Sequence, residues 1–288
     1  MQRFVLLAAA LGAVSACDDG SDVIVNTPGP LAYVRYVHAM PDTGTVDVRV
    51  VDQVVNLDCF NVPYRAVCPY QGVPAGNRHF KVFTASAAGN INVVTSAILD
   101  TTITLTANTY YTIVHTGFTR AGQNPADRFC VITDDAGTVT AGRFKVRTIV
   151  AAPGFAANQD IHLTTATNAA SGPAPAAGST PIYTAANVTA AAACPTPTAW
   201  VERDTVPSST TNGGAATLYA YDAGTATPAT ANVTVTLLSG APASGVATAV
   251  AGSRISGSAL TAFLFPAGVA GSPAAGAATA QQAIDKRP

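Results

Sequence analysis

The chain has 288 residues and a formal net charge of −1, and charged residues make up only 11% of it. Globular domains usually carry about 25% charged residues, so the composition offers no electrostatic basis for binding nucleic acid or a strongly acidic partner. Charged helix formers are scarce, since the chain has a single glutamate, Glu202, and three lysines, whereas valine, threonine, glycine and proline are plentiful. This profile is typical of short strands joined by turns, and it predicts an all-β fold.

The first 17 residues have the organisation of an export signal. Arg3 precedes an apolar run of roughly 11 residues, well short of the ~20 that a transmembrane helix needs, and Ser15 and Ala16 stand directly before Cys17. The segment resembles the bacterial lipobox, in which the peptidase cuts before an acylated cysteine. The resemblance implies that residues 1–16 are removed and that Cys17 becomes the lipidated N-terminus. An ordinary secretory signal with a chance cysteine is the alternative.

Either signal places the mature chain outside the cytoplasm, where disulfides persist. We therefore expect a lipid-anchored protein of the cell envelope, on the periplasmic side of the inner or outer membrane or on the cell surface. Once Cys17 carries lipid, Cys59, Cys68, Cys130 and Cys194 are an even number available for pairing. Four cysteines allow three connectivities. The short spacing favours Cys59 with Cys68, which leaves Cys130 with Cys194.

Strand signals follow one another closely from residue 31 onwards. Val46, Val48 and Val50 alternate with other side chains in a period of two, as expected of a strand. Further strands are predicted at 78–83, 93–98, 101–106, 109–117 and 127–134, separated by turn residues. Seven or so short strands in about 110 residues is the count expected of an immunoglobulin-like β-sandwich.

A stretch of this region recurs in degraded form 112 residues later, where Lys145–Pro153 echoes Tyr33–Pro41. A second echo relates Asn61–Pro69 to Asn187–Pro195 at a longer offset. The difference indicates an insertion of about a dozen residues within 164–180, where Ala, Gly and Pro predict a low-complexity loop.

The length of this repeat decides the domain organisation. A period above ~100 residues indicates duplicated domains, because the units of a solenoid are about 20 to 50 residues long. We predict two tandem immunoglobulin-like β-sandwiches, at 31–141 and 142–270. An acidic tether at 17–30 precedes them, and a C-terminal tail at 271–288 follows.

Several separated motifs of the first region occur in the order of a known family. They are Val34-Arg35, His38, Pro41-Asp42, Val46-Asp47-Val48, Val73-Pro74-Ala75-Gly76 and Val131-Ile132-Thr133-Asp134-Asp135. The region resembles the DUF4397 domain, a bacterial envelope module of unknown function that is often duplicated in lipoproteins. The second region is similar but degenerate, since Val150 stands in place of His38 and Gly154 in place of Asp42. The resemblance implies a β-sandwich and an envelope location, and no chemistry.

His38, Asp42 and Asp47 are the strongest candidates for a polar site. An imidazole at a strand end with two nearby carboxylates could form a general base with its orienting partner, or part of a metal site. Polar residues beside a tight loop more often bond to backbone groups. We therefore favour the interpretation that His38 and Asp47 bond to the Pro41 turn and hold the first two strands together.

Other chemical motifs are missing from the sequence. It contains no HxxxH or CxxC spacing, no GxSxG elbow and no phosphate-binding glycine loop. Asp134-Asp135-Ala136-Gly137 resembles half of a calcium loop but lacks the alternate oxygen ligands, so we predict a turn or the link to the second domain. We expect no catalytic residue, no metal and no cofactor.

These observations predict a lipid-anchored envelope protein with a non-catalytic binding or structural role. Its candidate partners, besides the membrane that holds its lipid, are an envelope protein or a glycan, for which aromatic side chains such as Tyr70 and Trp200 could form a platform. Nucleic acid is not expected. The alternative is a hydrolase or metal-dependent enzyme that uses His38, Asp42 and Asp47.

Overall fold

The structure is a computed structural model. It describes residues 29–53, 57, 59–85, 97–165, 173–188, 194–206, 215–225, 230–245 and 247–287. The signal segment, Cys17 and most of the tether lie outside the described residues, as do most of the strand predicted at 93–98 and part of the loop predicted at 164–180. Strands are the regular elements of the described residues, which contain no helix.

The first half of the chain is a sandwich of two sheets. Its strands are β1 (Leu31–Ala39), β2 (Val46–Val50), β3 (Gln71–Pro74), β4 (Gly76–Thr84), β5 (Leu99–Leu105), β6 (Tyr110–Thr116) and β7 (Arg128–Thr133). One sheet has the order β3-β1-β6-β7 and the other the order β2-β4-β5. β1 runs parallel to β6, and the other neighbours are antiparallel.

The second half has a similar arrangement with one strand more, β10, at the edge of its outer sheet. Its strands are β8 (Arg143–Val150), β9 (Gln159–Thr165), β10 (Tyr183–Ala185), β11 (Val201–Asp204), β12 (Ala216–Asp222), β13 (Val233–Thr236), β14 (Ala259–Phe265) and β15 (Thr279–Lys286). The sheets have the orders β11-β8-β14-β15 and β10-β9-β12-β13, and β8 is parallel to β14 as β1 is to β6. The prediction of an all-β fold built from β-sandwiches is confirmed.

Alternation along β1 explains how the halves meet. Successive side chains of a strand point to opposite faces. Val34 and Tyr36 pack into the core of the first sandwich, together with Phe80 of β4. Arg35 and Val37 point to the opposite face and are equally buried. A strand buried on both faces must be covered by a further layer.

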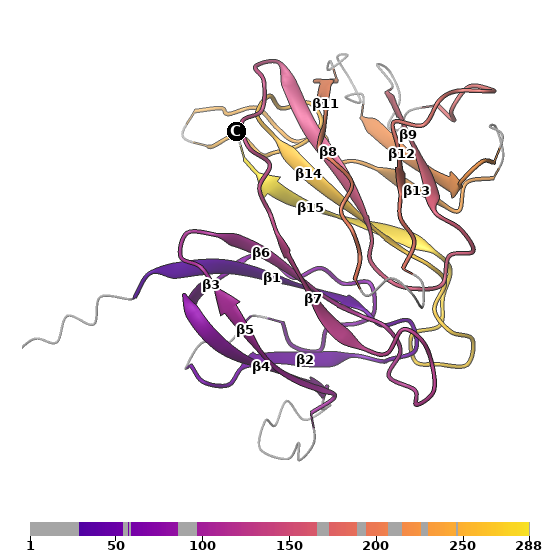
Figure 1. Cartoon of the computed structure of the whole chain (residues 1–288). Helices are drawn as coiled ribbons and strands as arrows, with labels where there is room; N and C mark the ends of the chain where they lie inside the picture. The colour runs from indigo at the N-terminus through magenta and orange to yellow at the C-terminus, as the bar shows by residue number, and fades with distance from the viewer. Residues whose placement is uncertain are drawn as a thin grey trace, which may run out of the picture.

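That layer is the sheet of the second half that contains β8 and β14. A separate apolar cluster joins the two sheets, with Val37 and Val114 from the first half and Ile149 and Phe263 from the second among its members. The molecule is therefore a stack of four sheets, in which β3-β1-β6-β7 and β11-β8-β14-β15 are the two middle layers (Figure 1).

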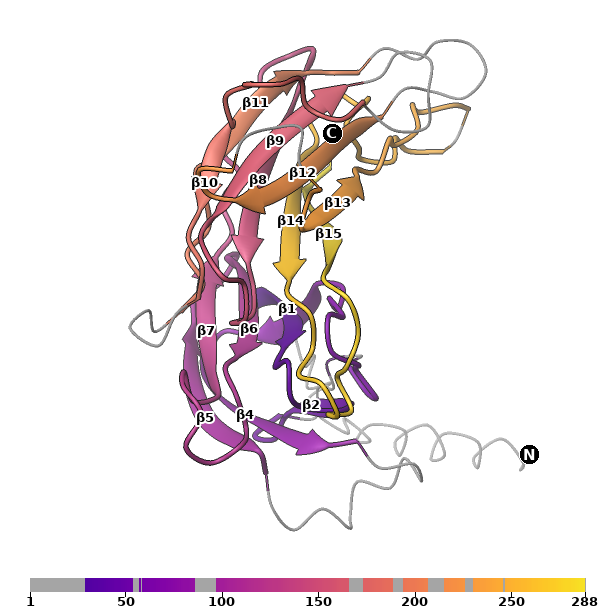
Figure 2. The ribbon, with the colours of Figure 1, turned by 90° about the vertical axis from the view of Figure 1, so that its right-hand side faces the viewer.

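The C-terminal segment belongs to this stack, so the prediction of a tail at 271–288 is wrong. β15 pairs with β14 from Thr279 to Lys286, with a register shift that leaves Asp285 without a partner on β14. The connection between them runs from the second sandwich down onto the first (Figure 2), where Val269 N–H donates to the carbonyl oxygen of Pro41 (2.7 Å) and Arg65 Nη2 donates to that of Gly276 (2.8 Å). Sequence periodicity misses β15 because its side chains are mostly half-buried and polar and apolar residues mix on both faces.

Both predicted disulfides are present. Cys59 and Cys68 are joined within the first half, at a Cα–Cα distance of 6.0 Å. Cys130 of β7 is joined to Cys194, ahead of β11, at a Cα–Cα distance of 5.5 Å. The second bridge therefore links the two halves covalently, in addition to the chain itself.

Candidate functional site

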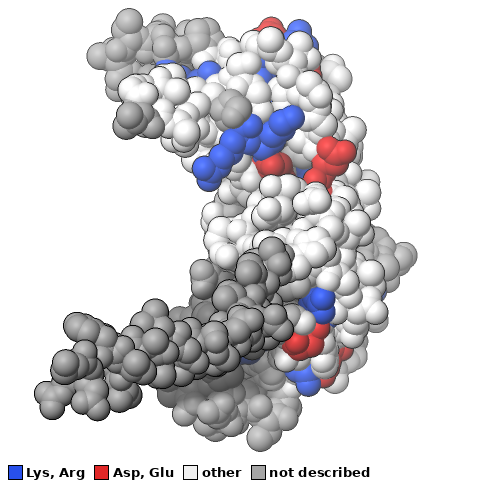
Figure 3. All heavy atoms as spheres, turned by 90° about the vertical axis from the view of Figure 1, so that its left-hand side faces the viewer, with Lys and Arg blue, Asp and Glu red and all other residues white. Residues whose placement is uncertain are grey.

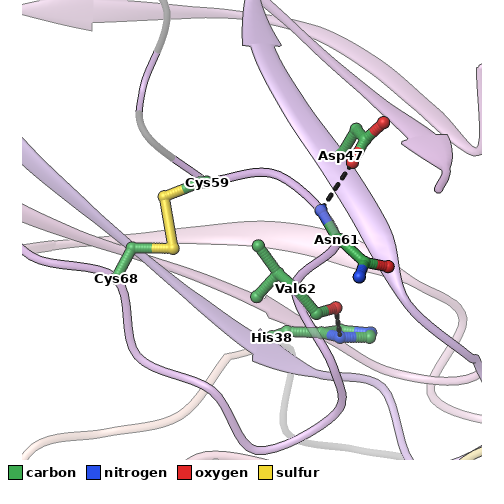
Figure 4. Close-up of a disulfide and its surroundings, with 6 residues drawn as sticks. All are labelled: His38, Asp47, Cys59, Asn61, Val62 and Cys68. Atoms are coloured by element: carbon green, nitrogen blue, oxygen red, sulfur yellow. Dashed lines mark hydrogen bonds between the residues drawn. A yellow bond between two sulfur atoms is a disulfide. The ribbon is translucent and has the colours of Figure 1, made fainter. Parts of the chain in front are cut away.

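His38 lies at the end of β1 with its imidazole fully buried. Its Nδ1 is 3.1 Å from the carbonyl oxygen of Val62 (Figure 4). A carbonyl can only accept, so Nδ1 carries the proton and the neutral ring keeps its lone pair on Nε2. Nε2 has no hydrogen-bond partner among the described residues. Burial lowers the pKa of His38 to about 4, so the ring is neutral in ordinary buffers.

Asp42 binds the backbone of the connection between β6 and β7. Its Oδ1 accepts the N–H of Thr119 (3.2 Å) and its Oδ2 accepts the N–H of Arg120 (3.1 Å). The connection turns back at Gly117, which has φ +106°, and a Cβ at this position would collide with the carbonyl oxygen of Ala126. The carboxylate therefore fixes a loop and is only 5% exposed.

Asp47 of β2 also bonds to the backbone. It accepts the N–H of Asn61 at 2.6 Å, one residue before the carbonyl that binds His38 (Figure 4). The expectation that His38 and Asp47 bond to the Pro41 turn is wrong, because both bond to Asn61–Val62. This segment forms a β-bridge with Val46 of β2, which places its peptide groups within hydrogen-bonding distance of the side chains of His38 and Asp47.

A second buried histidine accompanies His38. His115 of β6 stands opposite it in the parallel register, and its Nδ1 is 2.9 Å from the hydroxyl of Tyr36. Burial lowers the pKa of His115 as well. The described residues contain no group of three or more His, Cys, Asp or Glu side chains placed to hold a metal ion. His38, Asp42 and Asp47, the site residues predicted from the sequence, therefore bind backbone segments, and the imidazole of His38 is one of a buried, neutral pair.

A cluster that the sequence analysis did not predict lies between the two middle sheets. We call it the interface cluster, and its members are Arg35, Thr112, Asp134, Arg147, Thr261 and Asp285. The charged side chains are between 1% and 4% exposed. Two guanidinium groups face two carboxylates, so the charges balance, as buried ions require.

The two halves contribute to this cluster in the same way. Within the first half, Arg35 Nε donates to Thr112 Oγ1 (2.6 Å), which donates to Asp134 Oδ2 (2.5 Å). Within the second half, Arg147 Nε donates to Thr261 Oγ1 (2.8 Å), which donates to Asp285 Oδ2 (2.7 Å). The rings of Tyr70 and Trp200 lie under Arg35 and Arg147 respectively, at 4.6 and 4.5 Å.

Each half then binds the carboxylate of the other. Arg35 Nη2 donates to Asp285 Oδ1 (2.6 Å), and Arg147 Nη2 donates to Asp134 Oδ1. Such an exchange of equivalent contacts is the pattern of a two-fold symmetric interface, here formed within one chain. Burial raises the pKa of Asp285, and the two guanidinium groups oppose this effect.

One signal in the sequence could have located half of this cluster. Arg35 and Arg147 are equivalent positions of the repeat, and both lie on the strand face that alternation assigns away from the core. Asp134 and Asp285 carried no such signal, since Asp134 stood in a predicted link and Asp285 in a predicted tail. The Asp134–Gly137 segment is indeed the link between β7 and β8.

A groove opens beside the interface cluster, between the two sandwiches. Its volume is about 850 Å³, and its lining includes Pro69, Tyr70 and Tyr110 of the first half and Leu238 and Ile284 of the second. Figure 3 shows this face of the molecule hollowed between the sandwiches, with basic side chains above the hollow and acidic ones beside them. The volume lies in the range of about 300–1,000 Å³ that is usual for ligand sites.

Comparison with known proteins agrees with the motifs of the first half. Residues 32–161 match the family model described as a domain of unknown function, DUF4397. The match covers the first sandwich and continues through β8 to the start of β9. No curated protein matches the chain.

The described residues form no helix long and apolar enough to cross a membrane.

Proposed function

We propose that the chain is a lipid-anchored protein of the bacterial cell envelope with a non-catalytic binding or structural role. The observation that best supports the proposal is the set of hydrogen bonds that His38, Asp42 and Asp47 make. Each bonds to backbone groups, and the imidazole is sealed from solvent. A general base must reach the proton that it removes, so this arrangement weighs against the alternative of a hydrolase or metal-dependent enzyme.

The proposed location rests on the N-terminal segment and on the cysteines. The lipobox-like residues before Cys17 supply the anchor, and the membrane is then the first partner. Two disulfides among the remaining cysteines support an oxidising compartment such as the periplasm or the cell surface. They also account for every cysteine except Cys17, as the lipoprotein interpretation requires.

We further propose that the second half is a degenerate copy of the DUF4397-like domain of the first half. The matching strand orders and the parallel β1–β6 and β8–β14 pairs support this proposal. The interface cluster supports it too, because equivalent residues make equivalent bonds. The substitutions at Val150 and Gly154 mark where the copies have diverged.

The experiment that tests the anchor is intact-mass analysis of the protein purified from its native host. The expected product begins at Cys17 and carries acyl groups. A soluble product that begins at another residue, with Cys17 removed or unmodified, contradicts the proposal. For the role, an envelope extract passed over the wild type and over His38→Ala should give the same retained partners, because the buried imidazole contacts no ligand.

A further inference from the structure

β15 leaves part of its backbone without partners. It stands last in the order β11-β8-β14-β15 and pairs with β14. Alternate residues of such an edge strand direct their N–H and C=O groups away from the sheet. At Gln282 the edge is closed, because this side chain accepts the N–H of Leu238 (2.6 Å) and donates to the carbonyl of Thr236 (3.0 Å). Beyond it, over residues 283–287, no described residue bonds to the outer edge.

This open edge borders the groove. The lining contains every residue from Gln282 to Arg287 in succession. Side chains of a strand alternate between faces, so successive residues border one cavity when the cavity runs along the edge of the strand. The groove therefore presents a row of backbone donors and acceptors rather than one face of a sheet.

The other walls of the groove are largely apolar. Pro69, Tyr70 and Tyr110 stand on the side of the first sandwich, and Leu238 stands on the side of the second. Tyr110 is 40% exposed and Leu238 is 41% exposed. Large apolar side chains facing a hollow are the groups that a ligand's own apolar side chains can cover.

The groove lining holds equal numbers of positive and negative side chains. Arg35, Asp134 and Asp285 belong to the interface cluster, where they are paired with one another. Outside the cluster, the charged lining residues are Lys286, Arg287 and Asp135. The lining therefore has no large excess of either sign and does not favour a highly charged ligand.

We propose that an extended, uncharged polypeptide segment with apolar side chains binds in this groove by adding a strand to the open edge of β15. Only a polypeptide backbone repeats N–H and C=O groups at the spacing of a strand edge. The open edge comprises Ala283 to Lys286 of β15 and Arg287 after it, with a register irregularity at Asp285. It spans about 16 Å at ~3.3 Å per residue, which sets the length of the paired segment. The inference rests on the proposed binding role and specifies its partner.

The probe is a displayed library of random linear peptides, selected on the purified full-length mature chain. A selected peptide is then remade with a single N-methyl group at each backbone position in turn. Strand addition predicts that alternate N-methyl groups weaken binding by about tenfold or more, since each removes one hydrogen bond and adds a clash, while the intervening groups change it by less than about twofold. Failure to select any peptide, or a series without alternation, overturns the inference.

Two exposed apolar residues provide a matched pair of variants. Leu238 lines the groove, whereas Val131 of β7 does not and is 43% exposed. Leu238→Glu is expected to weaken peptide binding by about tenfold, because it places a charge against apolar ligand atoms. Val131→Glu should leave binding unchanged. Equal loss in both variants overturns the placement of the peptide in the groove.

Amide hydrogen exchange gives a readout that does not depend on a substitution. Peptide binding should slow the exchange of amides in residues 283–287, while the edge strand β5 keeps its rates. Slowing at β5 with none at β15 overturns the inference. It is separable from the proposed function: an acylated Cys17 together with no peptide binding refutes the inference alone, and alternating N-methyl effects without acylation refute the anchor alone.

Discussion

The two halves of the molecule share one strand plan but differ in what they bury. In the first half, the parallel pair β1–β6 places His38 opposite His115 inside the sandwich. In the second half, the equivalent pair β8–β14 places Val150 opposite Leu264. The arginine, threonine and aspartate of the interface cluster are present in both.

This difference separates two kinds of buried polar residue. The second sandwich buries Val150 and Leu264 in its core, so this fold forms without the histidine pair. The interface cluster, by contrast, needs both halves, because each guanidinium is matched by the carboxylate of the other half. The polar groups present in both halves therefore hold the halves together, whereas the histidine pair affects the first half alone.

The largest expected effect comes from breaking the interface cluster. Asp285→Ala removes the carboxylate that accepts from both Arg35 and Arg147. Removing one partner leaves buried charge uncompensated, so we expect the free energy of unfolding to fall by about 3–5 kcal/mol. Urea unfolding with the disulfides intact measures this loss. The control is Asp204→Ala, which removes the exposed ion pair to Arg143 and should have little effect. Similar losses in the two variants contradict the assignment.

One disulfide links the two halves and the other lies within the first half, so the loss of stability on removing each of them can be compared. Cys130 and Cys194 are 64 residues apart in sequence, and Cys59 and Cys68 are 9 apart. In the chain-entropy model, opening the longer loop costs about 4 kcal/mol and opening the shorter one costs somewhat under 3 kcal/mol. Thermal unfolding of the Cys130→Ala/Cys194→Ala and Cys59→Ala/Cys68→Ala proteins gives the order. A larger loss of stability in the Cys59→Ala/Cys68→Ala protein would show that contacts other than the Cys130–Cys194 bridge hold the halves together.

The histidine pair should make the first half sensitive to acid. Burial lowers the pKa of His38 to about 4, from about 6.5 in an unfolded chain, so between these values the unfolded chain binds more protons. Stability is therefore retained above pH ~6.5 and lost as the pH falls towards 4, by about 2 kcal/mol at pH 5 for His38 alone.

The second half supplies the control for this pH effect. His38→Val/His115→Leu copies Val150 and Leu264 into the first half, and the dependence of unfolding on pH between 8 and 5 should become flatter. Urea unfolding at a series of pH values measures both proteins. An unchanged slope would mean that the two imidazoles are not buried as neutral groups.

The smallest expected effect concerns Asp42, whose equivalent in the second half is Gly154. Asp42→Ala leaves the N–H groups of Thr119 and Arg120 without their acceptor, and we expect a loss of about 1–3 kcal/mol in unfolding free energy. Faster amide exchange at these two residues should accompany it. A loss of stability without a change in their exchange would place the effect elsewhere.

Local sequence patterns predict the positions of several strands but not how the strands pair. Turn residues and alternation predict β4, β6 and β7 close to their observed bounds, and counting predicts both disulfides. The parallel pairing of β1 with β6 joins residues 77 apart, such as Arg35 and Thr112, and no periodicity specifies that partner. For the same reason the sequence could nominate His38, Asp42 and Asp47 but not the Asn61–Val62 backbone that binds two of them.

The interface cluster could not be predicted from local sequence patterns, because its members lie far apart in the sequence. Asp285 binds Arg35, which lies 250 residues away in the sequence. The residues next to Asp285 in the sequence resemble an exposed tail. The repeat was the informative signal, because it showed that Arg35 and Arg147 are equivalent. The repeat does not show that the two halves face each other.

The most direct test of the pairing between halves is a double-mutant cycle on Arg35 and Asp285. The free energies of unfolding of the wild type, Arg35→Ala, Asp285→Ala and the double variant give the coupling between the two side chains. We expect a coupling of about 1–3 kcal/mol, because the residues share one buried network across the interface. A coupling within about 0.3 kcal/mol of zero, with losses that simply add, would contradict it.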